Sequence, residues 1–500
     1  MKKVIFVIAT VAVSAFVSCQ KEETANSQAD KEPIVFTAGI SSTDAKTTIE
    51  IDGDVAKLNW ETSDKVTIKD ADGHTAVYKV SEGAGTHVAK LVYESGDILS
   101  EPSTYTATLG KAPSTTQTYS ASGSVPIYMK APATTKPDDL RFEAQCGVLK
   151  FNLKDADHKV SSIIVSDGST KYTLKCNPAV SITTATDFFI AVPAGTYTSL
   201  TVYDGTGYVA YKTPSLPVAA NHVKPAKSSN LGFDIEGALS GRFTSASGRT
   251  VRFSKGNLQY QASTKKWRFA ASQQTVIGNK AGNTTASSDR PTSENWIDLY
   301  RYGTSGYNNK YPYMVSGTES TYPNASLDAN TDWGRYNAIS NGGSVTKLWR
   351  TLSSTEWGYI LNNRSAATRY IKATVNDKAC VLLFPDTYTH PSGYPALTNK
   401  NKATVKCSST SFTTAQFTEM EKRGVVCLPA TGYQDDGQTS VLEIGNGWGN
   451  YWTATKSGTD YKPYYFYFQG DQTAENSMSN KGADANAAFG FAVRLVTTVN

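Results

Sequence analysis

Cysteine is the side chain whose position in this sequence most directly suggests chemistry. Six cysteines occur, and Cys19 stands where an apolar run gives way to the charged stretch Lys21-Glu22-Glu23. The other five are Cys146, Cys176, Cys380, Cys407 and Cys427. Because five is an odd number, at least one of these thiols has no partner within the set, and their pairing stays open. No C-x2-C or H-x3-H spacing occurs, which argues against a zinc site and leaves no cofactor to expect.

The N-terminal residues have the layout of a secretory signal. Lys2 and Lys3 precede an apolar run over residues 4–17, which is shorter than the roughly 20 residues that a membrane-spanning helix needs. Ser18-Cys19 at its end resembles the lipobox of bacterial lipoproteins, although Phe16 stands where leucine is usual. The resemblance implies cleavage before Cys19 and acylation of its thiol, and several acyl chains would anchor the protein stably. A plain secretory peptide with an incidental cysteine is the alternative.

The charged stretch after Cys19 resembles a short export signal of some Gram-negative lipoproteins. The resemblance implies a protein on the outer face of the outer membrane. Residues 19–32 are polar and indicate a flexible tether.

Two long loops combine aromatic rings with amides and carboxylates, which are the groups that bind sugars. The loops are "YRYGTSGYNNKYPYMV" (300–315) and "GYQDDGQTSVLEIGNGWGNYW" (432–452). Sugar rings stack on aromatic faces, and carboxylates accept hydrogen bonds from hydroxyl groups. The candidate ligand-binding residues are Tyr307, Tyr311, Tyr313, Asp435, Asp436 and Trp448. Packing of these rings within their own loops is the alternative for each of them.

Other binding chemistries lack the residues that they need. A calcium-dependent sugar site wants a carboxylate–amide pair around proline, and neither "EPN" nor "QPD" occurs. His390, the only histidine in the second half, precedes Pro391 and indicates a surface turn. The net charge is +5 without a Lys/Arg run, so we expect no nucleic acid partner.

The elements that position these residues are predicted to be mainly strands. Apolar and polar residues alternate between turn signals such as Asp72-Gly73, Asp167-Gly168 and Asp204-Gly205. Helical patterns are absent before about residue 350. Helices are predicted where Ser353 with Glu356, and Thr413 with Gln416, form capping boxes, the second ending at Gly424. The fold class is therefore mainly β, with an α+β portion at the C-terminal end.

The first half resembles the fimbrillin family of gut-type Gram-negative bacteria. The segments that carry the resemblance occur in the order of the family: "TTIEIDGDVAKLNWETSDKVTI", "SGSVPIYMKAP", "FEAQCGVLKFNL", "FFIAVPAGTYTSLTV" and "VAANHVKP". The resemblance implies two transthyretin-like β-sandwiches, over residues 33–143 and 144–228, in a pilus subunit or surface adhesin. A linker over residues 229–240 follows them.

Polymerising members of that family are cut by an Arg-specific protease, which removes the first strand and opens a groove for a strand from the next subunit. This sequence has Lys46 where its relatives often show arginine, and its first arginine is Arg141. We therefore expect the chain to keep its first strand, roughly Ile34–Ile40. A tip, an anchor or a non-assembling protein suits this better than a repeating subunit.

Residues 241–500 resemble C-terminal domains with a C-type-lectin-like fold, which the formylglycine-generating (sulfatase-modifying) enzymes share. The matching segments are "WRTLSSTEWGYIL", "GVVCLPATGY", "GNYWTATKSGTDYKPYYFYF" and "FGFAVRLV". Enzymes of that family need reactive cysteines, but Cys380 and Cys427 lie in apolar runs that predict buried thiols. Trp333, Trp349, Trp357 and Trp452 are predicted to be core residues.

These observations together predict a non-enzymatic surface protein. We expect a lipid-anchored adhesin or a pilus-associated tip or accessory protein, with residues 241–500 as a ligand-binding head. Its partners would be the outer membrane, pilus subunits, and a glycan or host surface protein. A glycan-capturing accessory lipoprotein of a nutrient-uptake system and a cofactor-dependent oxidase are the alternatives.

Overall fold

The computed structural model describes residues 32–40, 45–52, 55–121, 125, 128–220, 222–229, 231–246, 248–286, 288–313, 321–458, 462–474, 477–481 and 485–499. Strands account for 42% of the chain and helices for 9%, which confirms the predicted mainly β class. The chain divides into two compact units, Met1–Ala112 with Pro126–Gln145 and Pro113–Val125 with Cys146–Asn500. The predicted signal peptide, Cys19 and nearly all of the tether lie outside the described residues.

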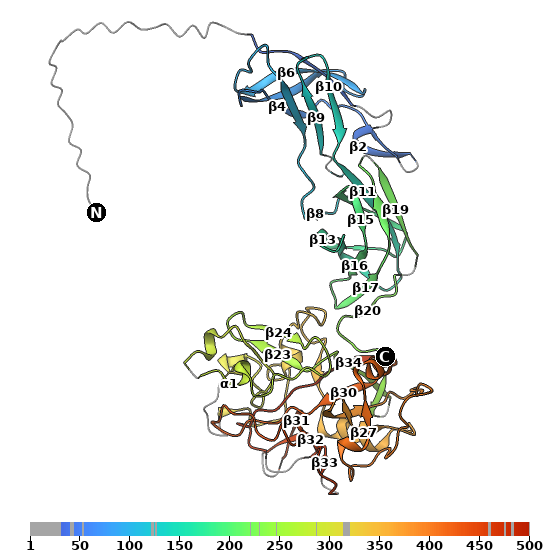
Figure 1. The fold of residues 1–500 in the computed structure, drawn as a ribbon, viewed down its shortest axis with the longest axis vertical. Helices are drawn as coiled ribbons and strands as arrows, with labels where there is room; N and C mark the ends of the chain where they lie inside the picture. Colours follow the sequence, from blue (N-terminus) through green and yellow to red (C-terminus); the bar gives the residue numbers. More distant parts are fainter. Residues whose placement is uncertain are drawn as a thin grey trace, which may run out of the picture. The chain divides into compact units, whose positions relative to one another are not determined.

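The first unit is a closed β-barrel (Figure 1). Its strands, in the order of their hydrogen bonding, are β1 (Phe36–Ile40), β10 (Leu140–Ala144), β9 (Met129–Thr134), β7 (Tyr105–Leu109), β4 (Lys65–Lys69), β5 (Thr75–Glu82) and β6 (Val88–Gly96). A separate pair is formed by β2 (Ala45–Asp52) and β3 (Val55–Leu58). Alternation sets the inward face: Val66 and Ile68 of β4 are fully buried, while the residues between and beside them are exposed.

Strand β1 closes this barrel. It pairs antiparallel with β6, where Phe36 lies opposite Leu91, and parallel with β10, where Ala38 lies opposite Leu140. The family resemblance implied a transthyretin-like sandwich over residues 33–143, and the structure differs in that β1 bonds to neighbours on both sides. Closure removes the open edges of the sheet.

The second unit begins with two facing sheets and a small third one. The three-stranded sheet has the order β14 (Thr186–Pro193), β11 (Cys146–Lys154), β19 (Val223–Ser229). The six-stranded sheet has the order β20 (Asp234–Ile235), β17 (Tyr208–Lys212), β16 (Ser199–Tyr203), β12 (Lys159–Ser166), β13 (Lys171–Ser181), β8 (Thr116–Thr118). The small sheet pairs β15 (Gly195–Tyr197) with β18 (Leu216–Val218). One apolar cluster, which includes Phe151, Ile163 and Phe188, fills the space between the strands.

Strand β8 corrects the predicted division of the chain. Residues 113–125 fall inside the predicted first sandwich, yet β8 pairs parallel with β13 and belongs to the second unit. The buried side chain of Gln117 fixes it there. The Gln117 amide donates to the carbonyl of Ala191 at 2.7 Å and accepts from the Ala191 amide at 3.0 Å. Side-chain pairing with a distant backbone is not visible in strand periodicity.

The predicted linker over residues 229–240 is also ordered where the structure describes it. Asp234–Ile235 form β20 at the edge of the six-stranded sheet, paired with β17. The Asp234 carboxylate accepts two hydrogen bonds from the guanidinium group of Arg252, and Ile235 is buried in an apolar cluster of the C-terminal region. Here the C-terminal region means residues 241–500. The described part of this segment is therefore packed and paired, and it is not a free linker.

The described residues of the C-terminal region form four small sheets (Figure 1). The first two have the bonding orders β21 (Phe243–Ala246), β22 (Arg249–Phe253), β34 (Leu495–Val499), β26 (Arg350–Thr351) and β24 (Lys266–Phe269), β23 (Leu258–Gln261), β25 (Trp296–Ile297). The other two have the orders β29 (Ser411–Phe412), β27 (Tyr370–Val375), β28 (Lys378–Leu383), β30 (Val426–Pro429) and β31 (Trp448–Lys456), β32 (Pro463–Gln469), β33 (Met478–Ser479). Its helices are short: α1 (Ala281–Thr284), η1 (Arg290–Thr292), η2 (Tyr307–Asn309), α2 (Trp333–Tyr336), α3 (Ser354–Gly358), η4 (Tyr359–Asn363), η5 (Cys407–Ser409) and α4 (Thr414–Lys422). Within the described part of the chain, no helix has the length and apolar character needed to cross a membrane.

Both predicted helices are present with their predicted caps. Ser353 and Glu356 form a capping box at α3, and Thr413 and Gln416 form one at α4. Gly424 follows α4 with a φ of 86°, as a helix stop requires. The four tryptophans that were predicted to be core residues, Trp333, Trp349, Trp357 and Trp452, are at most 1% exposed, which confirms that prediction.

Candidate functional site

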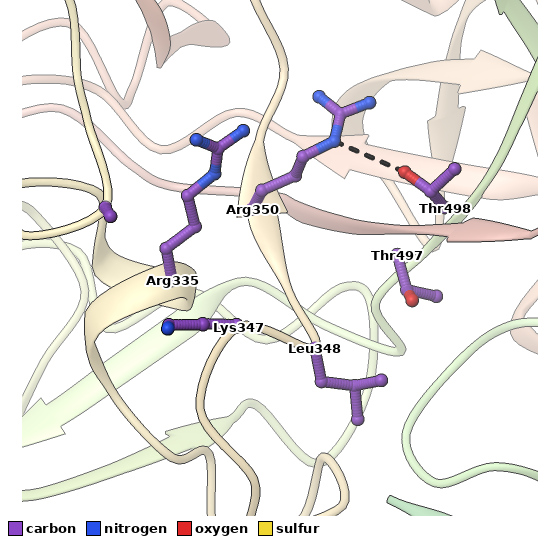
Figure 2. Close-up of a pocket in the computed structure, with 7 residues that line it drawn as sticks. Arg335, Lys347, Leu348, Arg350, Thr497 and Thr498 are labelled. Atoms are coloured by element: carbon purple, nitrogen blue, oxygen red, sulfur yellow. Dashed lines mark hydrogen bonds between the residues drawn. The ribbon is translucent and has the colours of Figure 1, made fainter.

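A pocket of about 540 Å³ opens in the C-terminal region (Figure 2). This size suits a small organic ligand or one or two sugar rings. Three cationic side chains line it, together with hydroxyl and aliphatic groups. The lining residues are Ala329, Arg335, Lys347, Leu348, Arg350, Thr497 and Thr498. In Figure 2 the side chains of Arg335 and Arg350 extend in the same direction.

Asp332 holds the helix that presents Arg335. Its Oδ1 atom caps α2 by accepting from the amides of Gly334 at 2.9 Å and Arg335 at 3.2 Å. Its Oδ2 atom accepts from the amide of Thr351 in β26 at 2.9 Å. Burial raises the pKa of Asp332. One buried carboxyl group thus ties α2 and β26 together, and each of these elements carries an arginine of the pocket.

The segment before β26 presents Lys347 next to Arg335. The Lys347 amide donates to the carbonyl of Arg335 at 3.1 Å, and Lys347 has a φ of 66°, which an L-residue adopts only when its surroundings hold it there. Gly334 allows α2 to lie this close: a Cβ atom on it would be 2.7 Å from the carbonyl carbon of Trp349. Backbone contacts therefore hold Lys347 next to Arg335.

Arg350 is the one pocket cation with an acidic partner. Its two terminal nitrogens donate to the Glu356 carboxylate at 2.6 and 2.8 Å, and its Nε donates to Thr498 Oγ1 at 3.4 Å (Figure 2). Burial would raise the pKa of Glu356, but the hydrogen bonds and charge of Arg350 outweigh it and lower that pKa. Arg335 and Lys347 form no ion pair with another described residue, and no acidic residue is among the lining side chains, all of which the structure describes. The pocket is therefore suited to an anionic group such as a carboxylate or sulfate.

Two exposed tyrosines adjoin the helix of this pocket. Tyr336 follows Arg335 at the end of α2 and is 39% exposed, and Tyr307 is 36% exposed. Their rings meet edge to face, with centroids 5.7 Å apart. Exposed aromatic rings of this kind offer the apolar surface on which sugar rings stack.

The other predicted aromatic residues lie apart from this pair. Tyr311 and Tyr313 stack on each other with centroids 5.5 Å apart, and both pack against the buried Tyr260. Trp448 is half-buried, and its indole nitrogen donates to Asp471 at 3.3 Å. For these three residues, the structure shows rings packed by their own neighbours.

The predicted carboxylates also lie away from the pocket. Asp435 accepts from the backbone amide of Asp436 at 2.8 Å, within its own turn. Asp436 is exposed and accepts from the side chain of Asn486 at 3.4 Å. The structure does not gather the six predicted ligand-binding residues into one site. Tyr307 is the one that contacts α2, through Tyr336, which is the chain neighbour of the pocket residue Arg335.

Sequence reasoning missed Arg335 and Lys347. They are single basic residues, separated from each other and from Arg350 by ordinary loop residues, so no run or motif marks them. The available signal was Asp332, a helix-capping residue directly before Trp333, which predicts a short helix that presents Arg335. The approach of Lys347 to Arg335 depends on tertiary contacts.

The five described cysteines are all free and buried. Burial raises the pKa of Cys380 well above its usual value and raises that of Cys407 to about 11, which disfavours the nucleophilic thiolate. In the described residues, one group brings three potential metal-ligand atoms within 4.8 Å of one another: Asp70, Asp72 and His74 in the barrel. Both oxygens of Asp70 already accept hydrogen bonds, from His74 and from Ser100, so this group carries no proposal.

Comparison with known proteins gives only distant similarity. No family model matches the chain, and no curated protein matches it. Among solved structures, the chain is similar to a "putative cell adhesion protein" from Bacteroides uniformis, with 14% identity over 40% of this chain and 96% of that one, and a TM-score of 0.26. It is also similar to a fimbrial assembly protein from Parabacteroides distasonis, with 10% identity over 47% of this chain and 98% of that one, and a TM-score of 0.19. A fimbrial protein from Bacteroides ovatus has 9% identity over 94% of this chain and 100% of that one, with a TM-score of 0.22.

Proposed function

We propose that this chain is a lipid-anchored surface adhesin, free-standing or at the tip of a pilus, whose C-terminal region binds an acidic glycan. The observation that carries the proposal is the cationic pocket with Arg335 and Lys347. The fimbrillin-like order of the sequence segments and the mainly β fold are consistent with a surface protein of this kind.

The chemistry of the pocket suits a sugar that carries a carboxylate or sulfate. Arg335 can bind two oxygens of such a group at once, and Lys347 adds a point charge. The hydroxyl group of Thr498 can exchange hydrogen bonds with sugar hydroxyls. Tyr336 and Tyr307 supply an aromatic surface for a second ring. The positive charges of Arg335 and Lys347 would select acidic ligands, and stacking of a sugar ring on the tyrosines would increase the affinity.

A glycan array probed with the full chain tests this proposal. We expect sialylated, uronic or sulfated glycans to bind and their neutral counterparts not to bind. The double variant Arg335→Gln/Lys347→Gln should lose at least tenfold in affinity. Lys266→Gln/Lys378→Gln removes the same charge from exposed positions outside the pocket and should bind normally. Binding that is equal for neutral and acidic glycans would contradict the proposal.

We further propose that the protein does not take part in strand-exchange polymerisation. Strand β1 bonds to both β6 and β10, so its loss would leave two unpaired edges. No arginine precedes Arg141, which lies within β10, so an Arg-specific cut there would split a barrel strand. N-terminal mass analysis of the protein from native cells should find a start at acylated Cys19. A start just after Lys46 would return the protein to the polymerising class.

The lipid anchor has its own test. Cys19→Ser removes the thiol that accepts the lipid, so the variant should leave the detergent phase in a phase-partition assay. Unchanged partitioning would contradict acylation at Cys19.

We propose no enzymatic activity for the C-terminal region. The oxidase alternative needs an accessible, reactive thiol, whereas Cys380, Cys407 and Cys427 are each 1% exposed. Labelling of the folded protein with a thiol reagent should leave all three unmodified. Rapid labelling of any of them would revive the enzyme alternative.

A further inference from the structure

A second cavity lies where the two aromatic loops of the sequence analysis meet. It has a volume of about 10 Å³, which is about the room of one water molecule. Arg301 and Tyr313 line it from the first loop, and Gln434 lines it from the second. Arg290 and Asn283 complete its polar wall. This cavity is separate from the cationic pocket, since the two share no lining residue.

The two arginines of this cavity are almost fully buried. Arg301 is 2% exposed, and Arg290 is 5% exposed. Arg301 donates to the side chain of Gln434 and to the carbonyl of Gln438, while Arg290 Nε donates to the carbonyl of Thr285 at 2.7 Å. All of these acceptors are neutral. Neither arginine forms an ion pair with a described residue.

Each guanidinium group also retains a buried nitrogen that has no acceptor: Nε of Arg301 and one terminal nitrogen of Arg290. The Tyr322 hydroxyl group is a third buried donor without an acceptor, and it lies near enough for Arg301 to influence its pKa. A buried charge without a partner is costly, and so is a buried donor without an acceptor. Burial lowers the pKa of Arg301, and the positive charge of Arg290 adds to this effect.

A water molecule would accept hydrogen bonds from these groups, but it would leave two like charges uncompensated. A small anion would accept hydrogen bonds from several of these N–H and O–H donors, and it would also neutralise the positive charge of the two arginines. The carboxylate whose charge acts on the pKa of Arg301 is that of Asp436, which is exposed and makes no salt bridge with it. The volume admits a single monoatomic ion and excludes a phosphate or a sugar.

We propose that this cavity is a binding site for a small monovalent anion such as chloride, held by Arg290 and Arg301. The bound ion would join Arg301 in the first aromatic loop to the segment around Arg290. Because Arg301 also bonds to Gln434 and Gln438, the ion would hold the second loop in place as well.

The first test is thermal unfolding of the full chain, followed by tryptophan fluorescence, in sodium chloride and in sodium gluconate at equal ionic strength. A ligand that binds the native state and not the unfolded chain raises the unfolding midpoint by an amount that keeps growing with the logarithm of its concentration once that exceeds the Kd. We expect such a logarithmic rise in chloride, and no comparable rise in gluconate. The rise should fall by at least half in Arg290→Gln. It should persist in Arg249→Gln, since Arg249 is exposed and outside the cavity. Equal midpoints in the two salts would overturn the proposal.

A second measurement decides the matter if the variants fail to fold. Crystals of the unmodified chain soaked in sodium bromide should show an anomalous scattering peak within hydrogen-bonding distance of Arg290 and Arg301. A cavity without this peak, in crystals that show bromide elsewhere, would equally overturn the proposal.

Discussion

The barrel and the C-terminal region bury different kinds of side chain. The barrel core is apolar, with Phe36, Trp60 and Phe142 among its fully buried members. Among the described residues of the barrel, Asp70 is the sole polar side chain in the buried class. The C-terminal region, by contrast, buries a set of charged side chains: Arg252, Arg290, Asp298, Arg301, Asp332, Glu356, Arg364, Lys372, Lys456 and Arg494.

The difference follows from how each region satisfies its backbone. Strands of a closed barrel bond to one another along both sides, so few backbone groups need side-chain partners. The C-terminal region consists of short elements joined by long loops, and buried side chains supply the missing partners. Arg364 donates to the carbonyls of Ile360, Phe384 and Arg369, and Lys372 donates to those of Ala403 and Gln472. Irregular backbone in a core thus requires buried polar groups.

The largest expected effect would come from the apolar core of the barrel. Phe36 is fully buried and packs edge to face on Tyr78 and Tyr105, with centroids 5.0 Å away in each case. Phe36→Ala should destabilise the barrel by about 4 kcal/mol through lost burial and a cavity. Urea unfolding followed by hydrogen exchange of barrel amides measures this. Phe36→Leu, which keeps most of the volume, should cost less than half as much. An equal loss for both would contradict this, because it would mean that the ring contacts rather than the buried volume set the cost.

In the C-terminal region, replacing the single buried residue Arg364 should lower the free energy of unfolding nearly as much as Phe36→Ala does in the barrel. Arg364→Leu removes three donors from buried carbonyls and leaves Asp386 without its partner at 2.7 Å. We expect a loss of about 3 kcal/mol. Tryptophan fluorescence reports on this region, because seven of the eight tryptophans lie beyond residue 240. Arg423→Leu is the control: Arg423 is exposed and its side chain makes one bond, of 3.4 Å, so its loss should be hardly measurable.

The two regions should also respond to acid in opposite directions. Burial raises the pKa of Asp298 in the C-terminal region to about 6. A raised native pKa means that the folded state binds the proton more tightly, so this contribution to stability is present at low pH and is lost as pH rises through about 6. The C-terminal region should lose about 2 kcal/mol between pH 4 and pH 7 from this group.

The pKa of Asp70 in the barrel is shifted in the opposite direction, so its effect on stability has the opposite pH dependence. Burial would raise its pKa, but hydrogen bonds from Ser100 and His74 outweigh burial and hold the pKa below its usual range. Its contribution is present above the ordinary aspartate pKa of about 4 and is lost as pH falls below that value. Urea midpoints of the two regions at pH 3, 5 and 7 would show this crossing. If the urea midpoints of the two regions changed with pH in the same direction, this prediction would be wrong.

The smallest expected effect compares two glycines that share a left-handed backbone. Gly73 turns a hairpin of the barrel with a φ of 96°, and a Cβ atom there would meet nothing within 4 Å. Gly73→Ala should cost about 1 kcal/mol, from backbone strain alone. Gly424 has a φ of 86°, but its Cβ would lie 2.3 Å from the Cα of Gly241. Gly424→Ala should therefore cost more, about 2 kcal/mol. Thermal midpoints of the two variants test the ranking.

Local rules made the inward-facing residues of the barrel strands and the two capped helices predictable from sequence, but not the closure of the barrel. Alternation places Val66 and Ile68 inside, and the Thr413–Gln416 box fixes the start of α4. Three features were beyond such rules: the pairing of β8 with β13, the packing of the linker through Asp234, and the pocket formed by Arg335 and Lys347. Each depends on contacts between residues far apart in the chain or on backbone angles that composition does not encode. Tyr307 was identified from its aromatic loop, while its neighbour Tyr336 was not.

Strand β8 belongs to the second unit although it precedes the last barrel strands in sequence. This matters for the design of protein fragments. A fragment that begins at residue 146 looks like a natural choice, because the barrel ends at Gln145. It would lack β8 and leave the eleven-residue strand β13 as a bare sheet edge. A long unpaired edge recruits strands from other molecules, so such fragments should associate or aggregate. The same geometry allows the β8 segment of one molecule to complete the sheet of another, which would give paired copies whenever the protein is concentrated during refolding.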